Sequence, residues 1–348
     1  MISEHDICEL FSTLLPSGRQ NACFESDAEV ISLRGANALF TTDEFSAEDL
    51  FREADPYALG WNIAVGAISD ILACGGTPLF YAHALTVSPR WGVDFLARFG
   101  QGVRAVLEAA DARFIGGDCG RSEHWRCTVS VIGSCDWPPV SRRGARAGDA
   151  LYLSGPIGAG NLEAALTLQA RELAADGSGS IRNLFALRRT ESSLMRKYAS
   201  ACIDTSDGFA GALHTLADLN QCGFAVTDPP YLPGAVDCFQ RLGLPNTLLC
   251  LGECGEYELL FTVNSKNEPA MLAEARQAGC AFYRVGEMTE AGRMLHQDGK
   301  AFDLSALRLS ARDFTTPRQY LAALSRLLAA ASAGVAAMPC NHDVCLTA

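Results

Sequence analysis

Four acidic segments interrupt apolar stretches of the chain, and their carboxylates are the side chains best suited to chemistry. The segments are Thr42-Asp43-Glu44, Ile68-Ser69-Asp70, Gly116-Gly117-Asp118 and Asp204-Thr205-Ser206-Asp207-Gly208. A carboxylate set against apolar residues is costly to desolvate unless a positive charge meets it. The chain has 28 Lys and Arg against 40 Asp and Glu, and basic residues are sparse near these segments. Divalent cations are the natural partners, and hard oxygen ligands of this kind suit Mg²⁺ that carries the phosphates of ATP.

The common nucleotide-binding motifs are absent from the sequence. A P-loop needs Gly-Lys followed by Ser or Thr, whereas the lysines at 197, 266 and 300 are followed by Tyr, Asn and Ala. The protein-kinase motif set is also missing. If this chain binds ATP, carboxylates and metal ions must hold the phosphates.

Composition narrows the class of protein. A length of 348 residues with 49% hydrophobic content is enough for two domains with separate cores. The net charge of −12 argues against a nucleic-acid partner, which requires a basic surface. No apolar run approaches membrane-spanning length, and the N-terminus lacks the pattern of a signal peptide. We therefore expect a cytoplasmic protein without a membrane partner, whose 14 scattered cysteines are reduced.

Elements of both kinds are expected to position the acidic segments in the first half of the chain. A strand at 38–42 delivers Asp43 at its end. Asp55 caps a helix that has Pro56 in its first position, contains Asp70 and ends at Gly75-Gly76. The remaining expected elements are helices at 4–15 and 93–110 and strands at 78–87, 113–116 and 127–133. The strand at 113–116 is expected to end in Gly-Gly-Asp.

A polar loop at 141–149 marks the expected boundary between two domains. Beyond it we expect a short strand at 202–203 that enters Asp204 and a helix at about 208–220. The other expected features are strands at 150–154, 257–263 and 282–285, a helix at 160–175, a loop at 178–180, a hairpin at Asp298-Gly299, an Ala/Leu-rich helix from Pro317 and a loose tail at 339–348. This irregular alternation predicts an α+β fold with domains at 1–148 and 149–312, followed by a helical extension and tail at 313–348.

Each acidic segment by itself has an ordinary structural explanation. Gly116-Gly117-Asp118 alone is typical of a turn, and Ser206-Asp207-Gly208 before a helix is typical of an N-cap. Asp70 is harder to explain in this way, because an Asp on the apolar face of a helix seldom serves packing. The set of segments, in this order, is more informative than any one of them.

The order of motifs resembles the aminoimidazole-ribotide synthetase-like superfamily and, within it, the thiamine-monophosphate kinases. The resemblance covers roughly residues 4–290. It is carried by Thr42-Asp43, the segment Asn62 to Pro78, Gly116-Gly117-Asp118, Arg142 to Asp149, Ile203 to Gly208 and Glu256 to Thr262. The sequence departs from the kinase pattern at Glu25-Ser26-Asp27-Ala28-Glu29, at Glu253-Cys254-Gly255-Glu256 and at the end, where the aromatic His-Phe terminus is not visible.

The resemblance implies a fold and a set of site residues. The fold would have an N-terminal mixed sheet with helices and a C-terminal α/β sandwich, with homodimers formed through the N-terminal domains and ATP between the domains. Asp118 and Asp207 would be catalytic. The metal ligands would be Asp27, Asp43, Asp70, Asp118, Asp204 and Asp207, and the nucleotide would contact Asp27, Thr42, Asp43, Gly117, Arg142 and Ser206. Arg142 is the candidate to contact the triphosphate, since a guanidinium can bind two oxygens at once.

Three functions remain open on the sequence. The first is a Mg²⁺- and ATP-dependent kinase with thiamine monophosphate as the favoured acceptor. The second is an enzyme that uses ATP to activate a carbonyl or amide oxygen for cyclisation, dehydration or ligation. The third is a non-catalytic nucleotide-binding scaffold. Cys340 and Cys345 could bind a metal, but their spacing fits no strong zinc pattern, and a loose end is the favoured interpretation.

Overall fold

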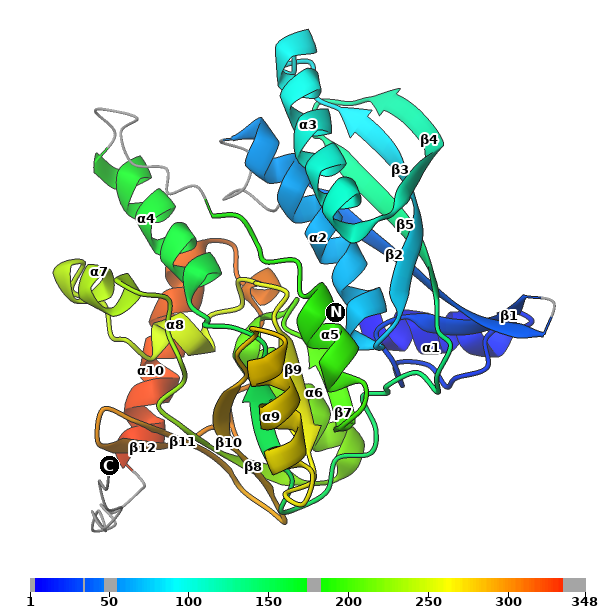
Figure 1. Ribbon diagram of the computed structural model, residues 1–348. Coiled ribbons are helices and arrows are strands. Elements are labelled where there is room, and N and C mark those ends of the chain that lie inside the picture. Colours follow the sequence, from blue (N-terminus) through cyan, green and yellow to red (C-terminus); the bar gives the residue numbers. More distant parts are fainter. Residues whose placement is uncertain (1–3, 34, 47–54, 174–182, 334–348) are drawn as a thin grey trace.

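The computed structural model describes residues 4–33, 35–46, 55–173 and 183–333 and shows two α+β domains, each built on its own mixed sheet (Figure 1). The two-domain α+β prediction is confirmed. The last strand of the first sheet ends at Ser134, and the first strand of the second sheet begins at Ala150. The predicted loop at 178–180 and the tail with Cys340 and Cys345 lie outside the described residues.

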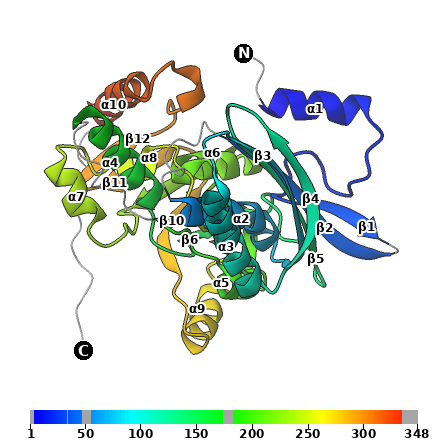
Figure 2. The same cartoon turned by 90° about the horizontal axis from the view of Figure 1, so that it is seen from above.

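The N-terminal sheet has the strand order β1-β2-β5-β3-β4, in which β3 and β4 are parallel and the other neighbours antiparallel. Helices α2 and α3 cover one face of this sheet (Figure 2). The elements are α1 (Glu4–Leu14), β1 (Glu29–Leu33), β2 (Ala36–Ser46), α2 (Pro56–Ala73), β3 (Thr77–Val87), α3 (Val93–Ala110), β4 (Arg113–Arg121) and β5 (Arg126–Ser134).

The C-terminal sheet has the order β12-β11-β8-β10-β6-β9-β7, in which only β11 and β8 are parallel among the described strands. Its strands are β6 (Ala150–Leu153), β7 (Ala199–Asp204), β8 (Gly223–Thr227), β9 (Leu259–Val263), β10 (Tyr283–Thr289), β11 (Arg293–Gln297) and β12 (Lys300–Asp303). Its helices are α4 (Ala159–Leu173), α5 (Arg189–Met195), α6 (Gly208–Asn220), α7 (Ala235–Arg241), α8 (Leu248–Leu251), α9 (Glu268–Gln277), the 3₁₀ turn η1 (Ala311–Asp313) and α10 (Pro317–Ala333).

Helix α2 forms as its sequence predicts and joins the two domains. Asp55 accepts hydrogen bonds from the backbone N–H groups of Tyr57 and Ala58, and Gly75 ends the helix with φ +72°. The helix is buried almost all round because the sheet and α3 cover one side and the C-terminal domain covers the other. On that second side, the Ser192 hydroxyl donates to the carbonyl of Leu72 at 2.6 Å.

Strand β4 is longer than predicted. It was expected to stop at 116, but it continues through Gly116-Gly117-Asp118 to Arg121. The two glycines have φ +116° and +157°, and the pairing with β3 shifts register between Tyr81 and His83. The glycines therefore form an irregularity inside the strand rather than a turn after it.

Several short elements were not predicted, namely β1, β8, α5, α7, α8 and α9. Most span few residues and owe their regular structure to neighbouring elements rather than to their own periodicity. The strand expected at 257–263 begins at Leu259, because Tyr257 adopts φ +59°. No helix in the described part of the chain is long and apolar enough to cross a membrane.

Candidate carboxylate site between the two domains

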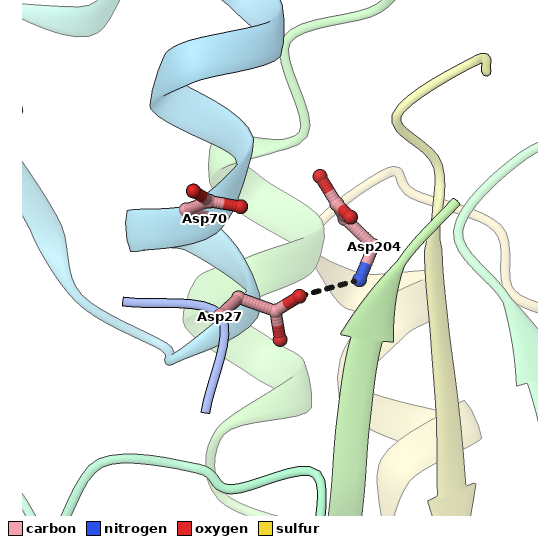
Figure 3. Close-up of side chains that lie close together, drawn as sticks. All are labelled: Asp27, Asp70 and Asp204. Carbon is pink, nitrogen blue, oxygen red and sulfur yellow. Dashed lines mark hydrogen bonds between the residues drawn. The ribbon is translucent and has the colours of Figure 1, made fainter. Parts of the chain in front are cut away.

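Three carboxylates from distant parts of the chain meet where the domains join. Asp27 lies in the bend before β1, Asp70 in α2 and Asp204 at the end of β7 (Figure 3). Each offers one oxygen, and these oxygens all lie within 4.8 Å of one another. Two of the three belong to the N-terminal domain and one to the C-terminal domain.

Hydrogen bonds fix the orientation of the three carboxylates. The Thr41 hydroxyl donates to Asp70 Oδ2 at 2.5 Å, and the Ser69 hydroxyl donates to Asp204 Oδ2. The backbone N–H of Asp204 donates to Asp27 Oδ1 at 3.4 Å, as drawn in Figure 3. Ser69 lies on α2 and Asp204 on β7, so its hydrogen bond also ties the domains together.

Positive charge is scarce at this site. Arg142 donates to Asp27 Oδ1 at 2.8 Å, and the Asp27 side chain is only 1% exposed. Burial raises the pKa of Asp70 well above its ordinary value, with Asp43, Asp204 and Asp27 adding to the effect. Burial and Asp27 also raise the pKa of Asp204 to about 6. An all-oxygen donor set with more negative than positive charge fits a hard divalent cation such as Mg²⁺.

The nucleotide-contact residues expected in β2 divide between the two faces of the sheet. Asp43 lies close enough for its charge to raise the pKa of Asp70. The exposed Thr42 instead bonds to the Val129 carbonyl at 3.1 Å on β5. Sequence reasoning missed Thr41, which is the threonine that contacts Asp70. Strand alternation could have found it, because residues 41 and 43 share one face.

Asp118 and Asp207 lie apart from the three-carboxylate cluster within one chain. Asp118 is exposed on β4 and accepts a hydrogen bond from the backbone N–H of Cys119 at 2.8 Å. The neighbouring Gly117 lies in the same row of the sheet as Asp43, three strands away, which corresponds to about 14 Å. Asp207 is exposed at the N-cap position of α6, but its side chain makes no capping hydrogen bond.

A cavity of about 600 Å³ opens between α3 and the start of β4. The His83 ring lines it, with ring-centroid distances of 5.2 Å to Phe114, 5.7 Å to Tyr81 and 6.3 Å to Phe99. His83 Nδ1 is buried and has no hydrogen-bond partner among the described residues. Arg104 and Arg113 also line the cavity. No motif in the sequence indicated this pocket, because its lining comes from separate elements.

A buried network supports the loop that carries Asp204. Glu258 forms two hydrogen bonds with Arg188, at 2.5 and 2.7 Å, and its backbone N–H donates to Thr205 Oγ1 at 3.0 Å. In return, the Thr205 N–H donates to the Glu258 carbonyl at 2.9 Å. Arg188 is 70 residues from Glu258 in the sequence, so the sequence did not indicate this pair.

Family models and curated relatives agree on the ancestry of the chain. Residues 25–135 match the AIR synthase related protein N-terminal domain, and residues 146–298 match its C-terminal domain. A thiamine-monophosphate kinase from Halobacterium salinarum is 29% identical over 293 residues, which is 81% of this chain and 96% of the relative. The thiamine-monophosphate kinase of Escherichia coli K12 is 29% identical over 258 residues, 72% of this chain and 78% of the relative.

Solved structures with the same fold come from two functional groups. A thiamine monophosphate kinase from Aquifex aeolicus has a TM-score of 0.67 at 24% identity, covering 84% of this chain and 96% of that one. AaThiL complexed with AMPPCP and TMP has a TM-score of 0.70 at 23% identity and covers 86% and 94%. Hydrogenase maturation protein HypE in complex with ATP has a TM-score of 0.65 at 20% identity and covers 88% and 96%. With both family models matched in order across most of its length, the chain belongs to the AIR synthase-related family.

Proposed function

We propose that this chain is a Mg²⁺-dependent enzyme that transfers the terminal phosphoryl group of ATP to a small acceptor, with thiamine monophosphate as the favoured acceptor. The observation that carries the proposal is the cluster of Asp27, Asp70 and Asp204, to which Arg142 is the one basic side chain paired among the described residues. Curated thiamine-monophosphate kinases similar over most of the chain support the choice of acceptor.

In this proposal the three clustered carboxylates and Asp43 hold the metal. Bound Mg²⁺ would neutralise charge on the phosphate oxygens, which is the main requirement of phosphoryl transfer. Arg142, held by Asp27, adds a guanidinium that can bind two phosphate oxygens. A bond forms between the acceptor oxygen and the γ-phosphorus while the bond to the β,γ-bridging oxygen breaks, and ADP leaves with that electron pair.

The cavity beside β4 is a suitable place for the adenine base. Its aromatic rings offer stacking surfaces, and the buried His83 Nδ1 lacks a protein partner. Phe114 and Asp118 are four residues apart on one strand, about 13 Å, which is close to the span from base to terminal phosphate in an extended ATP. A nucleotide lying along β4 would therefore bring its phosphates to Gly117 and Asp118.

We further propose that the active form is a homodimer paired through the N-terminal sheets. Within one chain, Asp118 lies too far from Asp43 to share a metal with it. Large apolar side chains are exposed on β3 and β4 on the face opposite the helices, with Phe80 41% and Ile115 57% exposed. A second chain against this sheet would cover them and could place its Asp118 near the carboxylate cluster of the first.

A second candidate function is the activation of a carbonyl or amide oxygen by ATP. The departure at Glu253 to Glu256 from the kinase pattern favours it, as does the similar fold of HypE with ATP. A non-catalytic scaffold is the least supported, because the carboxylate cluster is intact.

Two measurements test these functions. Mg-ATP should raise the unfolding temperature of the purified chain far more than ATP with EDTA, since a ligand that binds only the folded state stabilises it. Equal shifts in the two conditions would refute the metal site. Incubation with ATP and thiamine monophosphate should then yield thiamine diphosphate and ADP in equal amounts. ADP release that requires an amine or thiol co-substrate would favour the second function, and nucleotide binding without turnover the scaffold.

A further inference from the structure

A segment from the C-terminal half of the chain contacts helix α2 of the N-terminal domain. We name residues 183–196 the strap; it consists of an irregular stretch at 183–188, helix α5 and the residue after that helix. Figure 1 shows α5, in green, at the lower end of α2. Because α2 carries Asp70 of the carboxylate cluster, the strap bears directly on one element of the candidate metal site.

The first contacts of the strap are made in the first half of α2. The Asn62 side chain donates to the Asn183 carbonyl and accepts from the Phe185 N–H, each at 2.9 Å. The neighbouring Trp61 donates from Nε1 to the Phe185 carbonyl at 2.8 Å. Asn62 is only 2% exposed, so both its donor and its acceptor are used on the strap inside the protein.

Further contacts lie at the end of α2. The Ser192 hydroxyl donates to the Leu72 carbonyl at 2.6 Å, and Arg196 Nη1 donates to the Gly75 carbonyl at 3.3 Å. Asp70 lies between these contacts and those of the first half of the helix. The strap therefore fixes α2 on both sides of this carboxylate.

Apolar packing joins the strap to the N-terminal domain as well. Phe185 is 4% exposed and belongs to the core of that domain, as does Tyr257 from the C-terminal half. Their ring centroids are 5.1 Å apart. A Cβ on Gly66 of α2 would lie 3.0 Å from the Tyr257 ring, so the helix approaches these side chains closely. The strap is thus part of the packed interior rather than a surface connection.

Arg188 connects the strap to the C-terminal sheet. Its guanidinium binds both carboxylate oxygens of Glu258, at 2.5 and 2.7 Å, and the Glu258 side chain is only 6% exposed. A Cβ on Gly155 would lie 1.8 Å from Arg188 Nη2, so only glycine leaves room for this pair. A two-point contact between a guanidinium and a carboxylate fixes direction as well as distance, which a lysine cannot do.

Glu258 in turn holds the residue next to Asp204. Its backbone exchanges hydrogen bonds with Thr205, which directly follows Asp204 in the chain. The Glu256 N–H also donates to the Thr205 carbonyl at 3.2 Å. The strap therefore contacts the helix that carries Asp70 and, through Arg188 and Glu258, the loop that follows Asp204.

We propose that the strap positions the two halves of the carboxylate site relative to each other, with Arg188 as a positioning residue. Asp70 and Asp204 belong to different domains, and their like charges repel each other. Metal binding requires ligand distances within about 0.2 Å of their usual values, so the two elements must be held against this repulsion. The importance of this positioning for metal binding rests on the proposed function.

Hydrogen exchange of the full chain without metal or nucleotide tests the coupling. Arg188→Lys keeps the positive charge but loses the two-point contact with Glu258. It should raise the exchange rate of backbone amides at least about threefold in both 65–73 and 204–208, because each segment loses part of its support. Ser192→Ala removes one hydrogen bond at the α2 end and should also raise exchange at 204–208, although these residues belong to the other domain.

Two control variants separate positioning from other effects. Leu295→Ala creates a cavity in β11, which four strands separate from β7 in the sheet, and so lowers stability without touching the strap. It should not raise exchange preferentially at 65–73 and 204–208. Lys197→Gln breaks an exposed ion pair with Glu274 directly after the strap and should leave exchange at both segments unchanged.

Titration with Mn²⁺ tests the connection to the metal site, with the electron paramagnetic resonance signal of the free ion as the measure of binding. Arg188→Lys should bind Mn²⁺ about tenfold more weakly than the wild type, which is the lower end of the range for residues that orient metal ligands. Leu295→Ala should bind Mn²⁺ as the wild type does, since a general loss of stability leaves the folded site intact.

The outcomes separate this proposal from the proposed function. Exchange that rises only within the strap, or equally in Leu295→Ala, would overturn the positioning role even if the wild type binds metal. An unchanged Mn²⁺ affinity of Arg188→Lys, beside a wild type that binds the ion, would overturn the role of Arg188. Exchange as expected in a protein whose wild type binds no Mn²⁺ would keep the strap as the link between the domains and would refute the metal site of the proposed function.

Discussion

Replacing Asp70 by Asn should make the metal-free protein more stable while removing its response to Mg-ATP. Two unit charges 4.8 Å apart, the outer limit for the cluster oxygens, repel by about 3.5 kcal/mol at an effective dielectric constant of about 20. Asp70 has two such neighbours, and Arg142 offsets the charge of one of them, Asp27. Within the cluster one pair therefore remains uncompensated, and the nearby charge of Asp43 adds to the repulsion on Asp70. Partial protonation relieves some of its repulsion, so we expect the variant to gain about 1–3 kcal/mol.

Asparagine suits this experiment because it changes charge and little else. Its side-chain oxygen can still accept the hydrogen bond that Thr41 donates to Asp70. The free energy of unfolding would be measured by urea denaturation at pH 7.5, first with EDTA and then with saturating Mg-ATP. The wild type should gain stability from Mg-ATP by mass action, and the variant should lose most of that gain.

A matched control separates the cluster from ordinary surface charge. Asp237→Asn removes an exposed carboxylate from α7 and should change stability by less than about 0.5 kcal/mol under both conditions. If Asp70→Asn destabilised the EDTA-treated protein by more than about 1 kcal/mol, the carboxylates would be stabilising each other through Arg142. The cluster would then not require a cation to balance its charge.

Three further predictions concern the rest of the site. Asp118→Asn and Asp207→Asn should each reduce turnover at least about 100-fold with an unchanged unfolding temperature, because both side chains are exposed. Near-normal activity of either variant in an ATPase assay would show that the residue serves only a turn or a helix cap. Gly117→Ala should destabilise the fold and abolish ATP-dependent stabilisation, because its Cβ would lie 1.7 Å from the His83 carbonyl oxygen, and unchanged thermal unfolding would refute the backbone contact. Burial and two nearby arginines lower the pKa of His214 to about 3. The contribution of its neutral ring to stability is therefore complete above pH 6.5 and is lost as the pH falls toward 3. His214→Gln should flatten the pH dependence of the free energy of unfolding between pH 6.5 and 4, and an equally steep dependence in the variant would contradict a neutral ring.

Elements that depend on neighbouring residues along the chain could be predicted before the structure was known. Asp55 with Pro56 fixes the start of α2, and Gly75 fixes its end, because capping and backbone conformation depend on neighbours along the chain. The irregular alternation of strands and helices predicted the α+β class, and the acidic segments predicted a site rich in carboxylates. Short elements such as β1 and α5 were not predicted, since their own residues specify them weakly.

Long-range packing brings together only some of the six expected metal ligands, and no pattern along the chain predicts which ones. Asp27 and Asp204 are 177 residues apart in the sequence, yet a backbone hydrogen bond joins them. Asp118 belongs to an acidic motif, as Asp70 does, but the order of strands in the sheet places its neighbour Gly117 about 14 Å from Asp43. Spacing along a chain does not report distance across a sheet or between domains. Those distances follow from the long-range packing of α2 against both domains, which no local pattern encodes.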